Sequence, residues 1–316
     1  MNETVKKYKK TMGRIGTVLL VFTLVFQGSA FVVQLVSLLL SMALPKETAA
    51  VVSSLLSAAA YFASFAFSAW LYHLTEQKEN RQPVRFTPRL PSNAFLIIFA
   101  GVACVLAFAM VNTFAATFMG LTEPEEIFKL PNEFSSDSSI VLQFIAIAIV
   151  PALCEELLFR GVILSNLMPY GKATAIIISS LLFGLMHANF YQFLYATVAG
   201  LIMGCAYVLT ESIWCPVLIH FINNTVSVLQ VAVYDRFSEE HSWIIMLLYE
   251  ILLMAVGIVC AFFLLSKRSK PEKNVSFETV SFSPDMDHRE TFKGLLVPTV
   301  LAFSIISVLL AFARLA

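Results

Sequence analysis

The stretch Val150-Pro-Ala-Leu-Cys-Glu155-Glu156-Leu-Leu-Phe-Arg160-Gly161 decides how this chain folds, because it places three charges in apolar surroundings. Two adjacent carboxylates and an arginine stand inside a run that is otherwise apolar from Ile140 to Met168. Each such charge costs about 2.5–3.5 kcal/mol to insert at the centre of a membrane helix. Charges in such a helix face a partner or a wet cavity, so the rest of the chain has to supply one of these.

The composition is that of a membrane protein. Of the 316 residues, 58% are hydrophobic and only 13% are charged, and the mean hydropathy is +0.80. A soluble domain carries about a quarter of charged residues. Long apolar runs separated by short polar clusters predict an all-α, polytopic bundle of transmembrane helices. The formal net charge of zero excludes a strongly basic nucleic-acid-binding protein.

The apolar runs predict about nine spans, divided into three regions. An N-terminal region, 1–138, holds three spans, a central region, 139–233, holds four with the charged stretch, and a C-terminal region, 234–316, holds two. The first run, Ile15 to Leu44, is too long for the apolar part of a signal peptide and suits a tilted span. The expected spans are 15–44, 49–73, 93–120, 139–168, 173–189, 190–210, 212–233, 242–265 and 294–314.

Basic residues predict the orientation of these spans, because cytoplasmic loops are enriched in lysine and arginine. With a cytoplasmic N-terminus and an outside C-terminus, most basic residues fall inside, whereas the outside loops are acidic, as at Glu125 and Glu126. The localisation expected is a multi-pass protein of a cell membrane, in a bacterium the plasma membrane. The inside basic residues are Lys6, Lys7, Lys9, Lys10, Arg14, Lys78, Arg81, Arg85, Arg89, Lys172, Lys267, Arg268, Lys270, Lys273, Arg289 and Lys293.

Spacing predicts which intramembrane polar groups cooperate. Glu156 and Arg160 are four residues apart, so they share one helix face and can form an ion pair. Glu155 lies about 100° further around the helix, so its carboxylate points elsewhere. His220 and Asn224, on the seventh span, are also four apart and share a face.

Depth gives a second test of cooperation. Counted at about 1.5 Å per residue from the cytoplasmic ends, Glu155, His187, His220 and Asn224 fall within one layer roughly 10 Å thick. Each residue alone is as readily explained by a hydrogen bond between helices. The combination of a carboxylate, two imidazoles and an amide at one depth, from three helices, favours a functional site.

Three motifs in these spans resemble a known family. Glu155-Glu156-Leu-Leu-Phe-Arg160-Gly161 resembles the EExxxR motif of the CAAX-protease and bacteriocin-processing family, also called the Abi family. Phe183-Gly-Leu-Met-His187 resembles its FxxxH motif, and His220-Phe-Ile-Asn-Asn224, after Trp214 and Pro216, resembles its HxxxN motif. All three occur in the family's order, each on its own helix, and cover roughly residues 139–233.

The resemblance implies an intramembrane endopeptidase whose prenyl-processing relatives cleave near the C-terminus of lipidated proteins. Carried over by position, Glu155 with His187 activates the attacking water. His220 and Asn224 complete the site as metal ligand or as stabilisers of the oxyanion, and Glu156 with Arg160 gives structural support. The partners implied are a protein or peptide substrate in or at the membrane and the lipid bilayer, with no nucleic acid.

The residue types leave two mechanisms of amide hydrolysis open. The spans contain neither a G-x-S-x-G nucleophile motif nor H-E-x-x-H. In one mechanism Glu155, His187 and His220 bind a divalent metal, with Zn²⁺ the candidate, and leave a position for water. In the other, Glu155 is the general base assisted by His187, while His220 and Asn224 donate hydrogen bonds to the oxyanion. An amide at position 224 suits a donor better than a zinc ligand, which favours the metal-free mechanism.

A non-catalytic protein is the alternative reading. Buried carboxylates and histidines also mark proton relays, so a proton-coupled transporter or a bacteriocin-immunity factor fits the same residues, as does a scaffold that keeps the fold without turnover. The chain lacks visible inverted repeats, which argues against the transporter. Pro151, just before Glu155, could nevertheless break the fourth span as transporter helices are broken.

Overall fold

The computed structural model describes residues 3–87, 90–120, 140–267, 280–283 and 287–314. In this part of the chain the protein is helical, and the only β-type pairing is an isolated bridge between Gly171 and Phe282. A helix occurs at each of the nine expected spans, which confirms an all-α, multi-pass membrane protein. Seven of the described helices are long and apolar enough to cross a membrane, or eight if one bent pair is counted as one span.

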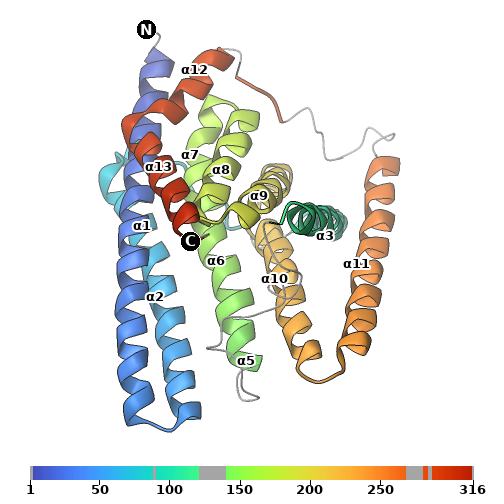
Figure 1. The fold of residues 1–316 in the computed structure, drawn as a ribbon. Helices are drawn as coiled ribbons and strands as arrows, with labels where there is room; N and C mark the ends of the chain where they lie inside the picture. Colours follow the sequence, from blue (N-terminus) through green and yellow to red (C-terminus); the bar gives the residue numbers. More distant parts are fainter. Residues whose placement is uncertain (1–2, 88–89, 121–139, 268–279, 284–286, 315–316) are drawn as a thin grey trace.

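The two N-terminal helices form a long hairpin. Helix α1 (Glu3–Ala43) and α2 (Lys46–Thr75) pack side by side and are joined by a tight turn at Pro45 (Figure 1). Proline suits this position, because it lacks the N–H that the first turn of a helix cannot bond. The far half of α1 exposes large apolar side chains such as Phe31 and Met42, as a lipid-facing helix does.

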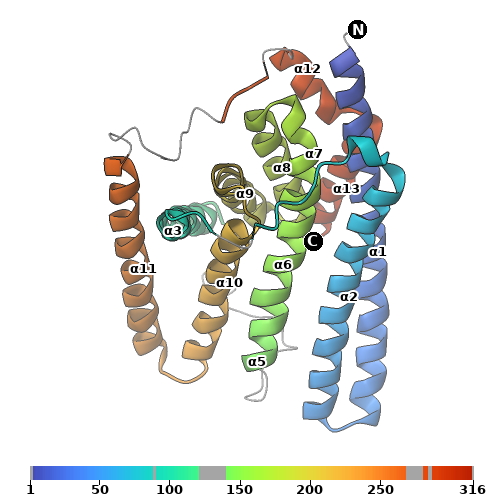
Figure 2. The same cartoon turned by 180° about the vertical axis from the view of Figure 1, so that it is seen from behind.

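The segment after this hairpin connects it to the middle of the protein. After the short turn η1 (Lys78–Asn80) the chain passes α7 (Ser165–Leu167) and reaches the start of α10 (Trp214–Tyr234) (Figure 2). The Gln82 N–H donates to Asn166 Oδ1 at 3.0 Å, and the Ile213 N–H donates to the Arg85 carbonyl at 3.0 Å. These bonds tie the loop to helices that lie far away along the sequence.

Helices α3 (Ala94–Phe118) and α11 (Glu239–Lys267) pack against each other away from the α1–α2 hairpin. They approach closely at Gly257, where a Cβ atom would lie 2.2 Å from the Cβ of Ala103. Small residues allow such close packing of membrane helices. Helix α3 also packs on α9 (Phe190–Thr210), and α11 follows α10 (Trp214–Tyr234) through a short turn.

The fourth expected span, 139–168, is a composite helix with two π-helical stretches. Wide turns of this kind interrupt the regular backbone bonding and often accompany functional sites. Glu155 and Glu156 are the last two residues of the α-helical piece that separates the two π-helical stretches. In order, the pieces are α5 (Ile140–Gln143), the π-helix η4 (Phe144–Ile149), α6 (Val150–Glu156), the π-helix η5 (Leu157–Leu164), α7 (Ser165–Leu167) and the 3₁₀ turn η6 (Met168–Tyr170).

The fifth expected span is a short helix that ends inside the protein. Helix α8 (Lys172–Met186) has 15 residues, or roughly 22 Å, which is less than the ~30 Å thickness of a bilayer core. Its C-cap is His187, after which Ala188 has a left-handed backbone with φ 45°. Asn189 then caps α9 by accepting the Gln192 N–H at 3.1 Å. In Figure 1 this α8–α9 turn lies beside the end of α13 (Pro298–Ala313), about halfway along α1.

The last span is bent. Helix α12 (His288–Lys293) and the turn η8 (Gly294–Leu296) precede α13 (Pro298–Ala313), with a bend of 64° before Pro298. Arg314 then donates from Nη1 to the His187 carbonyl at 3.1 Å. The predicted orientation, N-terminus in and C-terminus out, stays a prediction, and the acidic outside loop around Glu125 lies outside the described residues.

The three sequence regions interleave in space. Helix α1 packs on α13, and α3 packs on α11, so N-terminal and C-terminal regions contact each other on two sides. At Gly16 a Cβ atom would lie 2.5 Å from the backbone nitrogen of Val300, which shows how close α1 and α13 come. The division at 138 and 233 stays a prediction about the sequence.

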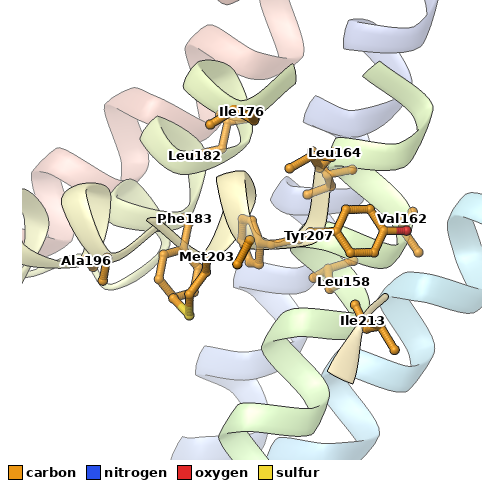
Figure 3. Packing of buried hydrophobic residues seen from close by; sticks show 14 of the residues in the cluster. Leu158, Val162, Leu164, Ile176, Leu182, Phe183, Ala196, Met203, Tyr207 and Ile213 are labelled. Atoms are coloured by element: carbon orange, nitrogen blue, oxygen red, sulfur yellow. The ribbon is translucent and has the colours of Figure 1, made fainter. Parts of the chain in front are cut away.

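One part of the buried apolar core lies where η5, α8 and α9 meet. Figure 3 shows Leu158, Val162, Leu182, Met203 and Tyr207 gathered there, and all five are buried. The ring of Tyr207 spans this cluster, and its hydroxyl lies 2.8 Å from Ser165 Oγ. This packed cluster fixes the relative positions of the helices that carry the three motifs.

Candidate active site

A buried carboxylate holds two cationic or polar partners at the centre of the bundle. Glu156 Oε1 accepts from Arg160 Nη1 at 2.8 Å and lies 2.9 Å from His220 Nδ1. Glu156 is fully buried, and Arg160 is 1% exposed. The second guanidinium nitrogen, Arg160 Nη2, donates to the Gly200 carbonyl on α9 at 3.1 Å. The predicted Glu156–Arg160 ion pair is therefore confirmed, and it also joins the composite helix to α9 and α10.

A guanidinium group and two imidazole rings pack against the ring of Phe183. Its centroid lies 4.6 Å from the Arg160 guanidinium carbon, a cation–π geometry. The His187 ring packs edge-on at 4.9 Å and the His220 ring at 6.1 Å, both measured between centroids. The two imidazoles thus lie against one aromatic ring, although they come from α8 and α10.

Glu155 points to a different neighbour, as its position on the helix predicts. Its Oε1 atom accepts a hydrogen bond from the hydroxyl of Tyr61 on α2. Its other oxygen, Oε2, is buried with no hydrogen-bond partner among the described residues. The two adjacent glutamates therefore have separate partners, which are Tyr61 for Glu155 and Arg160 with His220 for Glu156.

Hydrogen bonds define the available nitrogen of each imidazole. His187 Nδ1 lies 2.9 Å from the Phe183 carbonyl, so Nδ1 carries the proton, and Nε2 is left as an acceptor. His220 Nδ1 faces the Glu156 carboxylate, which leaves His220 Nε2 for another group. Both tautomers are assigned from these partners.

Asn224 is anchored to the composite helix. Its Nδ2 donates to the Ile147 carbonyl in η4 at 3.0 Å. Pro151, four residues later, has no N–H, so the α-helical backbone bond that this carbonyl would accept from position 151 cannot form. Asn223 donates to Asn224 Oδ1 at 3.2 Å and accepts from the Tyr195 hydroxyl at 2.6 Å. One N–H of the Asn224 amide is used by Ile147, and the second is left for another acceptor.

The four candidate catalytic residues are therefore partly brought together. His187, at the end of α8, and His220, on α10, pack on the Phe183 ring, and Glu155 on α6 is next to Glu156, which contacts His220. Asn224 lies one helical turn after His220, on the face of α10 that packs along η4 and α6. No hydrogen bond links Glu155 to His187 in the part of the chain that the structure describes, so a water or substrate would have to bridge them.

The residues expected for a metal site do not fit one as they are arranged. Glu155 Oε1 is engaged by Tyr61, whereas the Nδ1 bonds of His187 and His220 leave Nε2 of each ring available, as in a metal-binding histidine. Within the described ranges, no group of three or more histidine, cysteine, aspartate or glutamate side chains is placed to hold a metal ion. Zinc binding by Glu155, His187 and His220 stays a prediction without geometric support.

Sequence reasoning missed Tyr61 and the role of Phe183. Tyr61 stands in an apolar run with no motif around it, and 94 positions separate it from Glu155. The sequence marks Phe183 only as the first residue of the FxxxH motif, and spacing along one helix does not predict its contacts with Arg160 and His220 on other helices. Its position within the FxxxH motif is the signal that could have raised its importance.

The fold and these contacts define a multi-pass helical membrane protein with a buried polar centre among its motif-bearing helices. Residues 137–226 match the family described as "Type II CAAX prenyl endopeptidase Rce1-like". The chain is also 32% identical over 108 residues to "Putative membrane peptidase YdiL" of Bacillus subtilis (strain 168). That alignment covers 33% of this chain and 43% of the relative. No solved structure matches the chain. The resemblance to the CAAX-protease family is confirmed over residues 137–226.

Proposed function

We propose that this protein is an intramembrane endopeptidase that hydrolyses peptide bonds of a membrane-associated or lipidated protein or peptide. The observation that carries the proposal is the placement of His187 and His220 on the Phe183 ring, with His220 bonded to Glu156, the neighbour of Glu155 in the chain. These residues fall within the segment that matches the prenyl endopeptidase family. A carboxylate, two imidazoles and an amide are the groups that amide hydrolysis requires.

The proposed reaction uses a water activated by Glu155. Glu155 takes a proton from the water, whose oxygen forms a bond to the peptide carbonyl carbon. His220 Nε2, when protonated, and the second N–H of Asn224 donate to the resulting oxyanion. The C–N bond then breaks, and the proton taken from water passes to the leaving amine, with His187 Nε2 as an acceptor on its path. Glu156 holds the His220 ring through Nδ1, as a carboxylate orients a catalytic histidine.

We infer that the metal-free version of this reaction applies. It is supported by the arrangement of the side chains, because no group of three or more histidine, cysteine, aspartate or glutamate side chains in the described ranges is placed to hold a metal ion. Cleavage should therefore persist after incubation with 1,10-phenanthroline or EDTA, measured on the detergent-solubilised full chain. Loss of cleavage that returns on adding Zn²⁺ would overturn this inference and leave the endopeptidase proposal standing.

The main test is peptide cleavage by matched carboxylate variants. Purified full-length protein, in detergent and in liposomes, is incubated with a library of lipidated and unmodified peptides, and products are identified by mass spectrometry. Glu155→Gln should reduce the rate at least about a hundredfold, the scale of general-base catalysis, and His187→Ala and His220→Ala should do the same. Glu250→Gln, an intramembrane carboxylate on α11 outside the site, should retain the wild-type rate.

Two results would contradict the proposal. Full activity of Glu155→Gln would remove that residue from the mechanism. Proton-coupled uptake by wild-type proteoliposomes, with no cleavage of any peptide, would instead support the non-catalytic transporter. Comparison of membrane peptides from cells that carry wild-type protein or Glu155→Gln would then identify the natural substrate, because a substrate fragment should appear only with the wild type.

A further inference from the structure

We propose that Tyr61, on α2 and outside the family-matched segment, is a positioning residue that orients the Glu155 carboxylate for water activation. The inference rests on the proposed function, because it assigns Tyr61 a role only through Glu155. It makes the α1–α2 hairpin part of the active site, although none of the three motifs lies in that hairpin.

The contact comes from a helix that packs along the composite helix. Helix α2 contacts α5, η4, α6 and η5 in turn, so its face follows the segment that carries both glutamates. From this face the Tyr61 hydroxyl donates to Glu155 Oε1. Tyrosine is the donor that such a place requires, since its ring can be buried in apolar surroundings while its hydroxyl reaches a polar partner.

Aromatic neighbours fix the Tyr61 ring. It packs against Phe65 at 4.8 Å and edge-on against Phe26 at 5.7 Å between ring centroids. The rings of Phe65 and Phe22 lie 4.6 Å apart between centroids, so aromatic rings of both α1 and α2 pack around Tyr61. A hydroxyl on a ring held in this way can fix one rotamer of the glutamate that it contacts.

The bond leaves Glu155 with one hydrogen-bonded carboxylate oxygen and one that is unpaired within the described part of the chain. Oε1 is held by Tyr61, whereas Oε2 is buried without a partner among the described residues. The neighbouring carboxylate, Glu156, is instead held at Oε1 by Arg160 and His220. A base must present a free lone pair in a fixed direction, and this division of partners provides it at Glu155 Oε2.

The test is removal of the hydroxyl alone. Tyr61→Phe should lower kcat about 10- to 100-fold with little change in KM, the range expected for one lost hydrogen bond to a charged group. The matched control is Tyr72→Phe on the same helix, because the buried Tyr72 hydroxyl has no hydrogen-bond partner in the described part of the chain. It should keep the wild-type kcat and KM.

Two further variants separate positioning from packing and from the proposed function. If Tyr61→Phe behaves like wild type while Tyr61→Ala loses activity, only ring packing matters, and the proposal fails. An equal loss in Tyr61→Phe and Tyr72→Phe would also overturn it, because the loss would then follow from any hydroxyl removed from α2. If Glu155→Gln is itself fully active, the proposed function fails first, which is a distinguishable result.

Discussion

The motif-bearing helices differ from the α1–α2 hairpin in carrying buried charged, imidazole and amide groups that bridge two helices, although hydroxyls in both regions mostly bond their own helix. On the hairpin, hydroxyls mostly turn back to a carbonyl of their own helix, as Thr23 does to Leu19 and Ser68 does to Ser64. In the motif-bearing helices, Arg160, His220 and Asn224 reach across to neighbouring helices. A hydroxyl that bonds a carbonyl of its own helix does not constrain the neighbouring helix. A side chain that bonds across to another helix fixes the distance and the angle between the two helices.

The difference separates two parts of the protein. The frame is formed by the lipid-facing α1–α2 hairpin with α3 and α11, and the centre is the buried polar group of Glu156, Arg160 and His220. The frame is stabilised by apolar packing and by close approach at small residues such as Gly16 and Gly257. The centre requires its polar groups to be paired, because an unpaired polar group in an apolar interior is costly. Tyr8, Thr11 and Tyr61 are exceptions in the hairpin, because their hydroxyls reach other elements, and Tyr61 is the one of these three that bonds a carboxylate of a motif.

The largest expected effect breaks the central ion pair. Glu156→Gln leaves Arg160 buried without its carboxylate and should destabilise the protein by about 3–5 kcal/mol, the usual cost of removing one partner of a buried pair. Glu3→Gln removes the carboxylate of the exposed Glu3–Lys7 pair, 3.0 Å apart, and should leave stability unchanged. Unfolding in mixed detergent micelles measures both. Similar stability losses in the two variants would contradict the distinction between centre and frame.

A smaller effect is expected from the glycine in the FxxxH motif. A Cβ atom at Gly184 would lie 2.1 Å from Thr197 Oγ1 and 2.7 Å from the Phe193 carbonyl, where α8 meets α9. Gly184→Ala should cost about 1–3 kcal/mol by overpacking, and it should reduce activity by moving the turn at His187.

The matched control for this substitution lies on α1. At Gly28 an added Cβ meets nothing within 4 Å, so Gly28→Ala should be neutral or stabilise the protein by up to about 1 kcal/mol. Thermal unfolding in detergent, with activity measured in parallel, compares the two variants. A stable, active Gly184→Ala variant would show that α8 and α9 can move apart without consequence.

The smallest expected effect is a coupling between Asn224 and Pro151. Pro151→Ala supplies an N–H for the Ile147 carbonyl that Asn224 now satisfies. Asn224→Ala should therefore lower the unfolding free energy by less in the Pro151→Ala background than in the wild type. The expected difference is about 0.6–1.7 kcal/mol, the range for hydrogen bonds between membrane helices. A double-mutant cycle on unfolding free energy measures this difference. Strict additivity would mean that the Asn224 bond does not compensate for the proline.

Local sequence patterns predicted the parts of the site that lie on one helix. The Glu156–Arg160 pair follows from four-residue spacing, and the separate direction of Glu155 follows from 100° per residue. The same periodicity placed His220 and Asn224 on one face, and both do contact the composite helix. The π-helical stretches were not predicted, because wide turns leave no signature in apolar periodicity.

The sequence by itself determined a helical membrane protein, the approximate places of its spans and the three polar motifs. Helical bonding is local, and lipid selects long apolar runs, so both can be read along the chain. Only the tertiary structure decided that α8 ends at His187, that Phe183 collects two imidazoles and that Tyr61 bonds Glu155. These contacts depend on how separate helices pack, and nothing in a single sequence indicates that positions such as 61 and 155 are in contact.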